Sequence, residues 1–257
     1  MSGLELALAQ STLVGFLLAT ARAAGFVLTA PPFNTRTLPG RAKATLAMAL
    51  AIPLATPMGR GAPQLDDVQT LPSLALQVAV GAALGFLVQL AVSVVQMVGD
   101  LIDVAGGFSL SMAMDPLMMV QNSVMGRLHA YLAVTLLVAT DLHLTVLQGL
   151  SRSVQVMPGT DLKPSAMAAA VTEGAGSLMT AAVQVAGPLI AVMLVADVTL
   201  GLLTRAAPAL NAFALSFPLK IMLTLTIVGM IVVRLPDVLG SAVERGVGDI
   251  LRVVGAG

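Results

Sequence analysis

The carboxylates and the histidines are the residues of this chain that could do acid and base chemistry. Asp100 and Asp103 stand three positions apart, which places two carboxylates on one face of a helix end. General acid and base catalysis also needs a pocket and partner groups, which the neighbouring sequence does not supply. A solvated or capped helix terminus explains the pair more simply. Asp141 and His143 are two apart and point to different faces, so we interpret them as helix-end residues and not as a proton relay.

Charged side chains inside apolar sequence form a second group of candidates. Asp197 lies in an apolar run, and Arg205 follows about two helical turns later on the same face. An ionisable group at membrane depth usually faces protein or water. Asp197 is therefore open to two interpretations, a transport function or structural pairing with a neighbouring subunit. Arg22, in the first apolar run, poses the same question, although long cations near helix ends also snorkel to the interface.

Enzyme and cofactor chemistry finds little support in the remaining residues. The chain has no cysteine, which excludes disulfides, thiolate catalysis and cysteine-bound metals. A metal site built on the two histidines, His129 and His143, would need carboxylate ligands as well. The sequence contains no phosphate-binding glycine loop, nucleophile elbow or zinc signature. We therefore predict a protein with no catalytic activity of its own and no cofactor.

The composition is that of a chain embedded in a membrane. Hydrophobic residues make up 57% of the 257 positions and charged residues only 10%, whereas soluble domains carry about 25% charged residues. Thirteen basic residues balance thirteen acidic ones, so no nucleic-acid partner is indicated. Aromatic residues make up 3%, with no Trp, although lipid-facing spans usually carry Trp and Tyr belts. We expect membrane lipid and other apolar surfaces as partners.

Six apolar runs divide the chain, and we predict an all-α integral membrane protein built on them. Five runs are long enough to cross a bilayer, which takes about 20 apolar residues. The second run, which ends with Pro53 and Pro57, is shorter, and we predict a buried or re-entrant helix there. The runs are residues 4–30, 44–57, 71–98, 128–150, 178–203 and 213–233.

Two further patterns indicate that some of these runs pack against protein. If the runs alternate between the two sides of the membrane, the basic residues between them fall equally on both sides, although the positive-inside rule sorts most multi-span proteins. Gly81 and Gly85 form a GxxxG pattern, and residues 166–187 are mostly Ala, Gly and Ser. Small residues let helix backbones approach closely. We therefore expect extensive contact between helices and with other subunits.

Three stretches, taken in order, resemble one family. They are APPFNTRTLPGR at residues 30–41, GDLIDVAGGFSLSMAMDP at 99–116 and GLLTRAAPALNAFALSFPLKI at 201–221. They resemble the first conserved loop, the central loop and the C-terminal signature of the flagellar biosynthetic protein FliR family, whose counterpart in virulence type III secretion is the T subunit of the export apparatus. The resemblance covers nearly the whole chain, so we expect a single FliR-like membrane domain over residues 1–257. Ala209 and Ser216 depart from the family's usual glutamine and glycine without a change of charge.

The resemblance implies a subunit of the flagellar type III protein export gate in the bacterial inner membrane, within the flagellar basal body. Its partners would be FliP-like, FliQ-like and FlhB-like subunits, with unfolded flagellar proteins as substrates in transit. In that family the helices form bent hairpins that wind into a helical complex, which would explain the weak aromatic belt and the short second run. The residues that we predict at subunit contacts are Arg22, Asp197, Arg205, Pro208, Asn211, Phe213, Pro218 and Lys220.

The central loop of the family contributes to the plug that closes the channel. Gly106 and Gly107 permit a sharp exit from the preceding helix, and Pro116 discourages a simple continuation of it. Met112 and Met114 are unbranched and adaptable, so they can fill an irregular lumen and yield to a passing chain; ordinary core packing is the alternative. The predicted plug loop consists of Gly106, Gly107, Phe108, Ser109, Leu110, Ser111, Met112, Ala113, Met114, Asp115 and Pro116.

Two other functions stay open at this point. A secondary transporter for a small solute would use Asp197, Arg205 or Arg22 at a midplane site between broken helices. The injectisome counterpart of the same family is the second alternative. The stretch LNAFALSFPLKI at residues 210–221 is closer to the flagellar branch, which we therefore favour.

Overall fold

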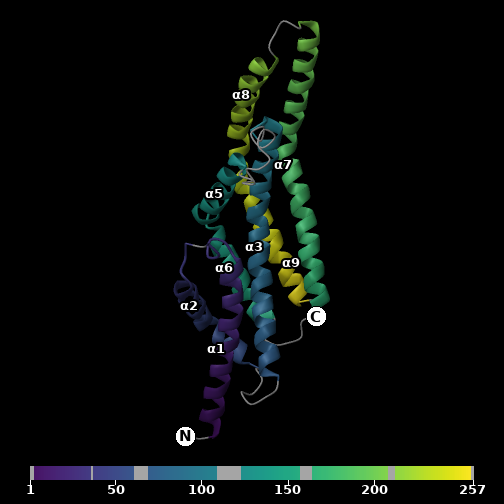
Figure 1. Ribbon diagram of the computed structural model, residues 1–257. Helices are drawn as coiled ribbons and strands as arrows, with labels where there is room; N and C mark the ends of the chain where they lie inside the picture. Colours follow the sequence, from purple (N-terminus) through teal and green to yellow (C-terminus); the bar gives the residue numbers. More distant parts are fainter. Residues whose placement is uncertain are drawn as a thin grey trace. The chain divides into compact units, whose positions relative to one another are not determined.

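The computed structural model describes residues 3–35, 37–60, 69–108, 123–156, 164–207 and 212–255, and their regular secondary structure is α-helical (Figure 1). This confirms the predicted all-α fold. The helices are α1 (Gly3–Thr29), α2 (Gly40–Gly59), α3 (Thr70–Gly106), α5 (Val124–Ala139), α6 (Leu142–Val156), α7 (Pro164–Ala206), α8 (Ala212–Val232) and α9 (Leu235–Gly255).

Length and hydropathy allow four of the described helices to cross a membrane on their own. They are α1 over Gln10–Thr29, α2, α3, and α7 over Val171–Ala206. Two more spans are possible if α5–α6 and α8–α9 each count as one, and in these pairs the chain bends by 71° and 53° at the break. An all-α membrane protein with about six apolar segments, some of them bent, is therefore confirmed.

The prediction that the second apolar run is too short to cross a membrane is wrong. Helix α2 has 20 residues because it begins at Gly40, before Arg41 and Lys43, and continues through Pro53 to Gly59. The two cations end the apolar run in the sequence, but long basic side chains at a helix end can reach the membrane surface. Ile52 is 68% exposed, so α2 is also not buried on all sides.

Residues 128–150, predicted as one span, belong to two helices. The break falls at Thr140 and Asp141, and Asp141 adopts a left-handed φ of 57°, which Asp tolerates better than most residues. The carbonyl oxygen of Asp141 accepts a hydrogen bond from the N–H of Leu144 at 2.9 Å and so opens α6. Asp141 therefore lies at a helix end, as predicted.

Several helices extend beyond the apolar runs that predicted them. Helix α3 has 37 residues and α7 has 43, so at 1.5 Å per residue both are much longer than the hydrocarbon layer of about 30 Å. Helix α9 was not predicted at all. Its buried residues Leu235, Leu239 and Val243 recur at helical spacing between exposed charges, and this pattern contains no continuous apolar run.

The chain divides into two compact units. Unit 1 consists of Met1–Ala91, Asp141–Gly176 and Ser241–Gly257, and unit 2 of Val92–Thr140 and Ser177–Gly240. Helices α3, α7 and α9 each contribute residues to both units.

Glycines bring α1 and α3 into close contact in unit 1 (Figure 1). A Cβ atom on Gly81 would overlap the backbone oxygen of Arg22, and one on Gly85 would lie 2.7 Å from the backbone oxygen of Phe26. Gly25 of α1 meets the backbone of Val78 in the same way. The GxxxG pattern at Gly81 and Gly85 is therefore used within the chain, where it lets two helix backbones touch.

Candidate functional site

Helix α3 ends in a tight cap immediately before residues 109–122. The N–H of Phe108 donates a hydrogen bond to the backbone oxygen of Asp103 at 3.1 Å, and the N–H of Gly107 donates to that of Val104 at 3.3 Å. This pair of bonds, with Gly107 at a φ of 79°, forms a Schellman motif. Gly107 is needed here because residues with a Cβ are strained at positive φ.

Gly106, the neighbouring residue, has a packing role. A Cβ atom on Gly106 would lie 2.7 Å from Oγ1 of Thr224 on α8 and 3.0 Å from the ring of Phe108, all within unit 2. Thr224 is itself buried. The two glycines were predicted to permit a sharp exit from the helix. In the structure Gly106 allows a close approach of α8, and Gly107 fixes the direction in which the chain leaves α3.

Asp103 joins the end of α3 to the start of α5. The residue is 3% exposed, and its Oδ1 accepts a hydrogen bond from the backbone N–H of Met125 at 3.2 Å. The first N–H groups of a helix have no partner within it and lie at the positive end of its dipole. Asp103 is therefore not solvated at the end of its own helix, because it caps the N-terminus of another one.

Close packing accompanies this hydrogen bond. Oγ of Ser123, the residue before α5, accepts a hydrogen bond from the N–H of Gly126 at 2.8 Å. The carboxylate of Asp100 occupies the space where a Cβ of Gly126 would be, and a Cβ on Gly99 would collide with the backbone of Met125. We call this set the α3–α5 junction, which consists of Gly99, Asp100, Asp103, Ser123, Met125 and Gly126.

The α3–α5 junction ties together the two ends of the segment that carries most of the predicted plug. Gly106, Gly107 and Phe108 immediately precede this segment and form the cap of α3. The other predicted plug residues lie outside the described residues, so their role stays a prediction. They are Ser109, Leu110, Ser111, Met112, Ala113, Met114, Asp115 and Pro116.

Asp197 and Lys220, two of the predicted contact residues, bind each other in unit 2. Nζ of Lys220 on α8 lies 2.6 Å from Oδ1 of Asp197 on α7. The two residues lie at nearly equal distances along the chain from the connection at 207–211, as expected for two helices that run back along each other. Arg205, predicted on the same face as Asp197, is exposed in the last turn of α7. Eight residues of helix rise about 12 Å, too far for an ion pair.

Arg22 is buried completely in unit 1, among α1, α3 and α6. Its Nε–H donates a hydrogen bond to Oε1 of Gln77 at 2.7 Å, and its NH1 group donates to Oγ of Ser153 at 3.2 Å. The guanidinium therefore does not snorkel to an interface. A contact of Arg22 with another subunit stays a prediction, while the partners that the structure gives it are in the same chain.

The remaining predicted contact residues lie on α8 or just before it. Pro218 is exposed within α8, and Phe213 lies in its first turn. Pro208 and Asn211 lie outside the described residues.

The sequence did not identify Gly99, Ser123 and Gly126 as parts of a site. Only Ser123 carried a recognisable signal, because serine directly before a helix is a common N-cap.

The amino-acid sequence matches a known family of bacterial proteins. Residues 13–246 match the family described as Bacterial export proteins, family 1. This chain belongs to that family. The match spans most of both units, and it confirms the resemblance found in the three conserved stretches.

Individual relatives agree with the family match. The chain is 30% identical over 207 residues to the flagellar biosynthetic protein FliR of Escherichia coli (strain K12), covering 78% of this chain and 77% of that protein. It is 28% identical over 211 residues to FliR of Bacillus subtilis (strain 168), covering 80% and 81%. The surface presentation of antigens protein SpaR of Salmonella typhimurium is 30% identical over 211 residues, 79% of each chain. The chain is a FliR-type membrane protein and a subunit of a type III export apparatus.

Proposed function

We propose that this subunit belongs to the flagellar export gate of the bacterial inner membrane, at the flagellar basal body. Its partners there are FliP-like, FliQ-like and FlhB-like subunits, and unfolded flagellar proteins pass through the gate. The subunit forms part of the channel and catalyses no reaction. The FliR relatives and the stretch at residues 210–221 support the flagellar branch over the injectisome.

We further propose that residues 106–116 form a plug that closes the channel. The α3–α5 junction is the observation that carries this proposal. The chain leaves α3 through a glycine cap and re-enters a helix at Ser123, and Asp103 holds the two ends together. A hydrogen bond from a backbone N–H to a carboxylate typically contributes more to stability than one between neutral groups. The base of the segment therefore stays in place while its apolar, methionine-containing part moves to admit a substrate.

Exposed apolar side chains support assembly with other subunits. Helices α7 and α8 present large apolar residues that are more than half exposed, which suits contact with protein or lipid in a membrane. They include Met179, Leu194, Val195, Val198 and Leu202 on α7, and Met222 and Leu225 on α8.

The plug is tested by deletion of residues 109–114, which leaves the glycine cap and Phe108 intact. We expect the complex to assemble and still secrete a flagellar substrate, while the membrane becomes permeable to small ions and dyes. The reason is that an open pore wide enough for a polypeptide does not exclude hydrated ions. Secretion and dye uptake are measured in the same cells. Normal secretion without added permeability, or loss of the complex, would show that the segment serves packing.

A further inference from the structure

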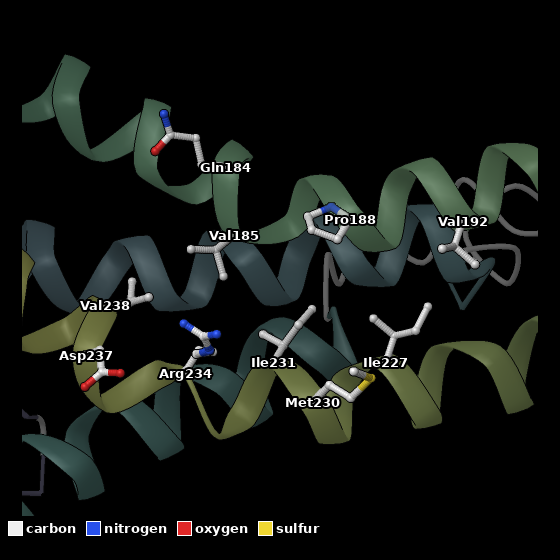
Figure 2. A pocket seen from close by; sticks show the side chains of 10 residues that line it. All are labelled: Gln184, Val185, Pro188, Val192, Ile227, Met230, Ile231, Arg234, Asp237 and Val238. Atoms are coloured by element: carbon white, nitrogen blue, oxygen red, sulfur yellow. The ribbon is translucent and has the colours of Figure 1, made fainter.

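A groove of about 620 Å³ lies between α7 and the α8–α9 break in unit 2 (Figure 2). Val185, Pro188 and Val192 line it on α7, and Ile227, Met230 and Ile231 line it on α8. Its polar side chains gather toward one end, where α9 begins. The groove is therefore apolar along most of its length and polar at one end, which is the pattern of an amphiphile.

Arg234 is the cation at the polar end. It stands at the break between α8 and α9, and Figure 2 shows its guanidinium pointing across the groove toward Val185, while the carboxylate of Asp237 points away from it. No ion pair among the described residues includes Arg234. A guanidinium is shaped to bind phosphate oxygens through two parallel N–H groups.

Pro188 also lines the groove on α7. Because proline has no N–H, it cannot donate the helical hydrogen bond to the backbone oxygen of Gln184.

We propose that this groove binds a phospholipid. One acyl chain lies along Val192, Ile227 and Met230, and the phosphate binds the guanidinium of Arg234. The apolar lining matches the chain, and the charge of Arg234 is complementary to the phosphate. This inference does not depend on the flagellar branch or on the plug.

Site-specific photocrosslinking in the solubilised complex tests the proposal. A photoreactive phenylalanine derivative replaces Met230, which is 70% exposed, or Leu225, which is 55% exposed on the same helix but does not line the groove. Phosphatidylglycerol is added at increasing concentration, and the crosslinked mass is identified. We expect saturable phospholipid adducts at position 230 and only weak, unsaturable adducts at 225. If the Met230 variant does not accumulate, Val192 across the groove replaces it.

The role of the phosphate is tested with two substitutions and a second lipid. Arg234→Gln should raise the half-saturating lipid concentration about tenfold, as expected for loss of a hydrogen bond to a charged group. Arg245→Gln, an exposed arginine of α9 outside the groove, should leave it unchanged. Diacylglycerol, which lacks the phosphate, should bind the unchanged chain as weakly as phosphatidylglycerol binds the Arg234→Gln variant. Adducts with another subunit at position 230, equal adducts at 225, or no effect of Arg234→Gln would overturn the proposal.

Discussion

The buried carboxylate of Asp103 accepts a hydrogen bond from the backbone N–H of Met125, 22 residues further along the chain, at 3.2 Å. This contact connects the last turns of α3 to the first turn of α5, on either side of the predicted plug. It gives a paired carboxylate motif a structural role. It also makes separate predictions possible for the base of the segment and for the segment itself.

Removal of the Asp103 carboxylate should weaken the connection between the end of α3 and the start of α5. Asp103→Ala leaves the N–H of Met125 buried without its acceptor, which should cost about 1–3 kcal/mol of stability. Asp103→Asn keeps an oxygen acceptor and should cost less. Thermal unfolding of the solubilised complex measures both, with Glu173→Ala, which removes an exposed acid from the interior of α7, as the control. Equal stability of Asp103→Ala and the unchanged complex would contradict the capping role.

Substitution of Gly106 should act through Thr224. The added Cβ of Gly106→Ala meets Oγ1 of Thr224 at 2.7 Å, and such overpacking typically costs about 1–3 kcal/mol. Thr224→Ala removes that oxygen, so the double variant should recover part of the loss, while the ring of Phe108 still crowds the new methyl group. A double-mutant cycle on unfolding temperatures measures the coupling. Purely additive effects would show that the two residues do not share this contact.

At Gly107 the expected cost has a different cause. Gly107→Ala should destabilise by about 1–2 kcal/mol because alanine is strained in the left-handed region, and Gly107→Asn should cost less because Asn tolerates it. Neither is expected to be rescued by Thr224→Ala. Comparison of these variants with Gly106→Ala in the same unfolding assay separates backbone strain from crowding. Identical behaviour of Gly107→Ala and Gly107→Asn would contradict the role of the positive φ.

The buried Arg22 should make Gln77 sensitive to substitution. Gln77→Leu removes the acceptor that lies 2.7 Å from Nε of Arg22 and leaves that buried N–H without it, at a cost of about 2 kcal/mol. Gln89→Leu, further along α3, serves as the comparison because it removes the acceptor of a neutral donor, the side-chain amide of Asn34, at 2.8 Å. Yield of the assembled complex and its unfolding temperature are the measurements. A larger effect of Gln89→Leu than of Gln77→Leu would argue against the Arg22 contact.

The ion pair between Asp197 and Lys220 predicts a charge-swap rescue. Asp197→Lys and Lys220→Asp should each lower complex yield. Each replaces the two opposite charges, now 2.6 Å apart, with two like charges that repel each other. The double variant restores opposite charges and should recover most of the yield. Immunoblots of the purified complex measure this. If the double variant is no better than the singles, the pair does not hold α7 to α8 in the assembled protein.

The sequence by itself determined the class of this protein, its apolar segments and its family. Hydropathy is a local property, so 10% charged residues and long apolar runs were sufficient to predict a helical membrane protein. The stretches at 30–41, 99–116 and 201–221 were sufficient for the family, because each is a continuous motif. Gly81 and Gly85 also signalled helix contact correctly, since the GxxxG spacing places both on one face.

Only the tertiary structure decided which residues meet. Asp197 pairs with Lys220 on the next helix of the same chain, whereas the sequence left it open between a transport function and pairing with a neighbouring subunit. Asp103 caps α5, and Arg22 donates a hydrogen bond to Ser153, which lies 131 residues further along the chain. Contacts of this kind depend on how helices are placed against each other, and local patterns of residues carry no record of that placement. The ends of α2, α3 and α7 were missed for a related reason, since a helix continues past its apolar run when packing or a cap holds the next turn.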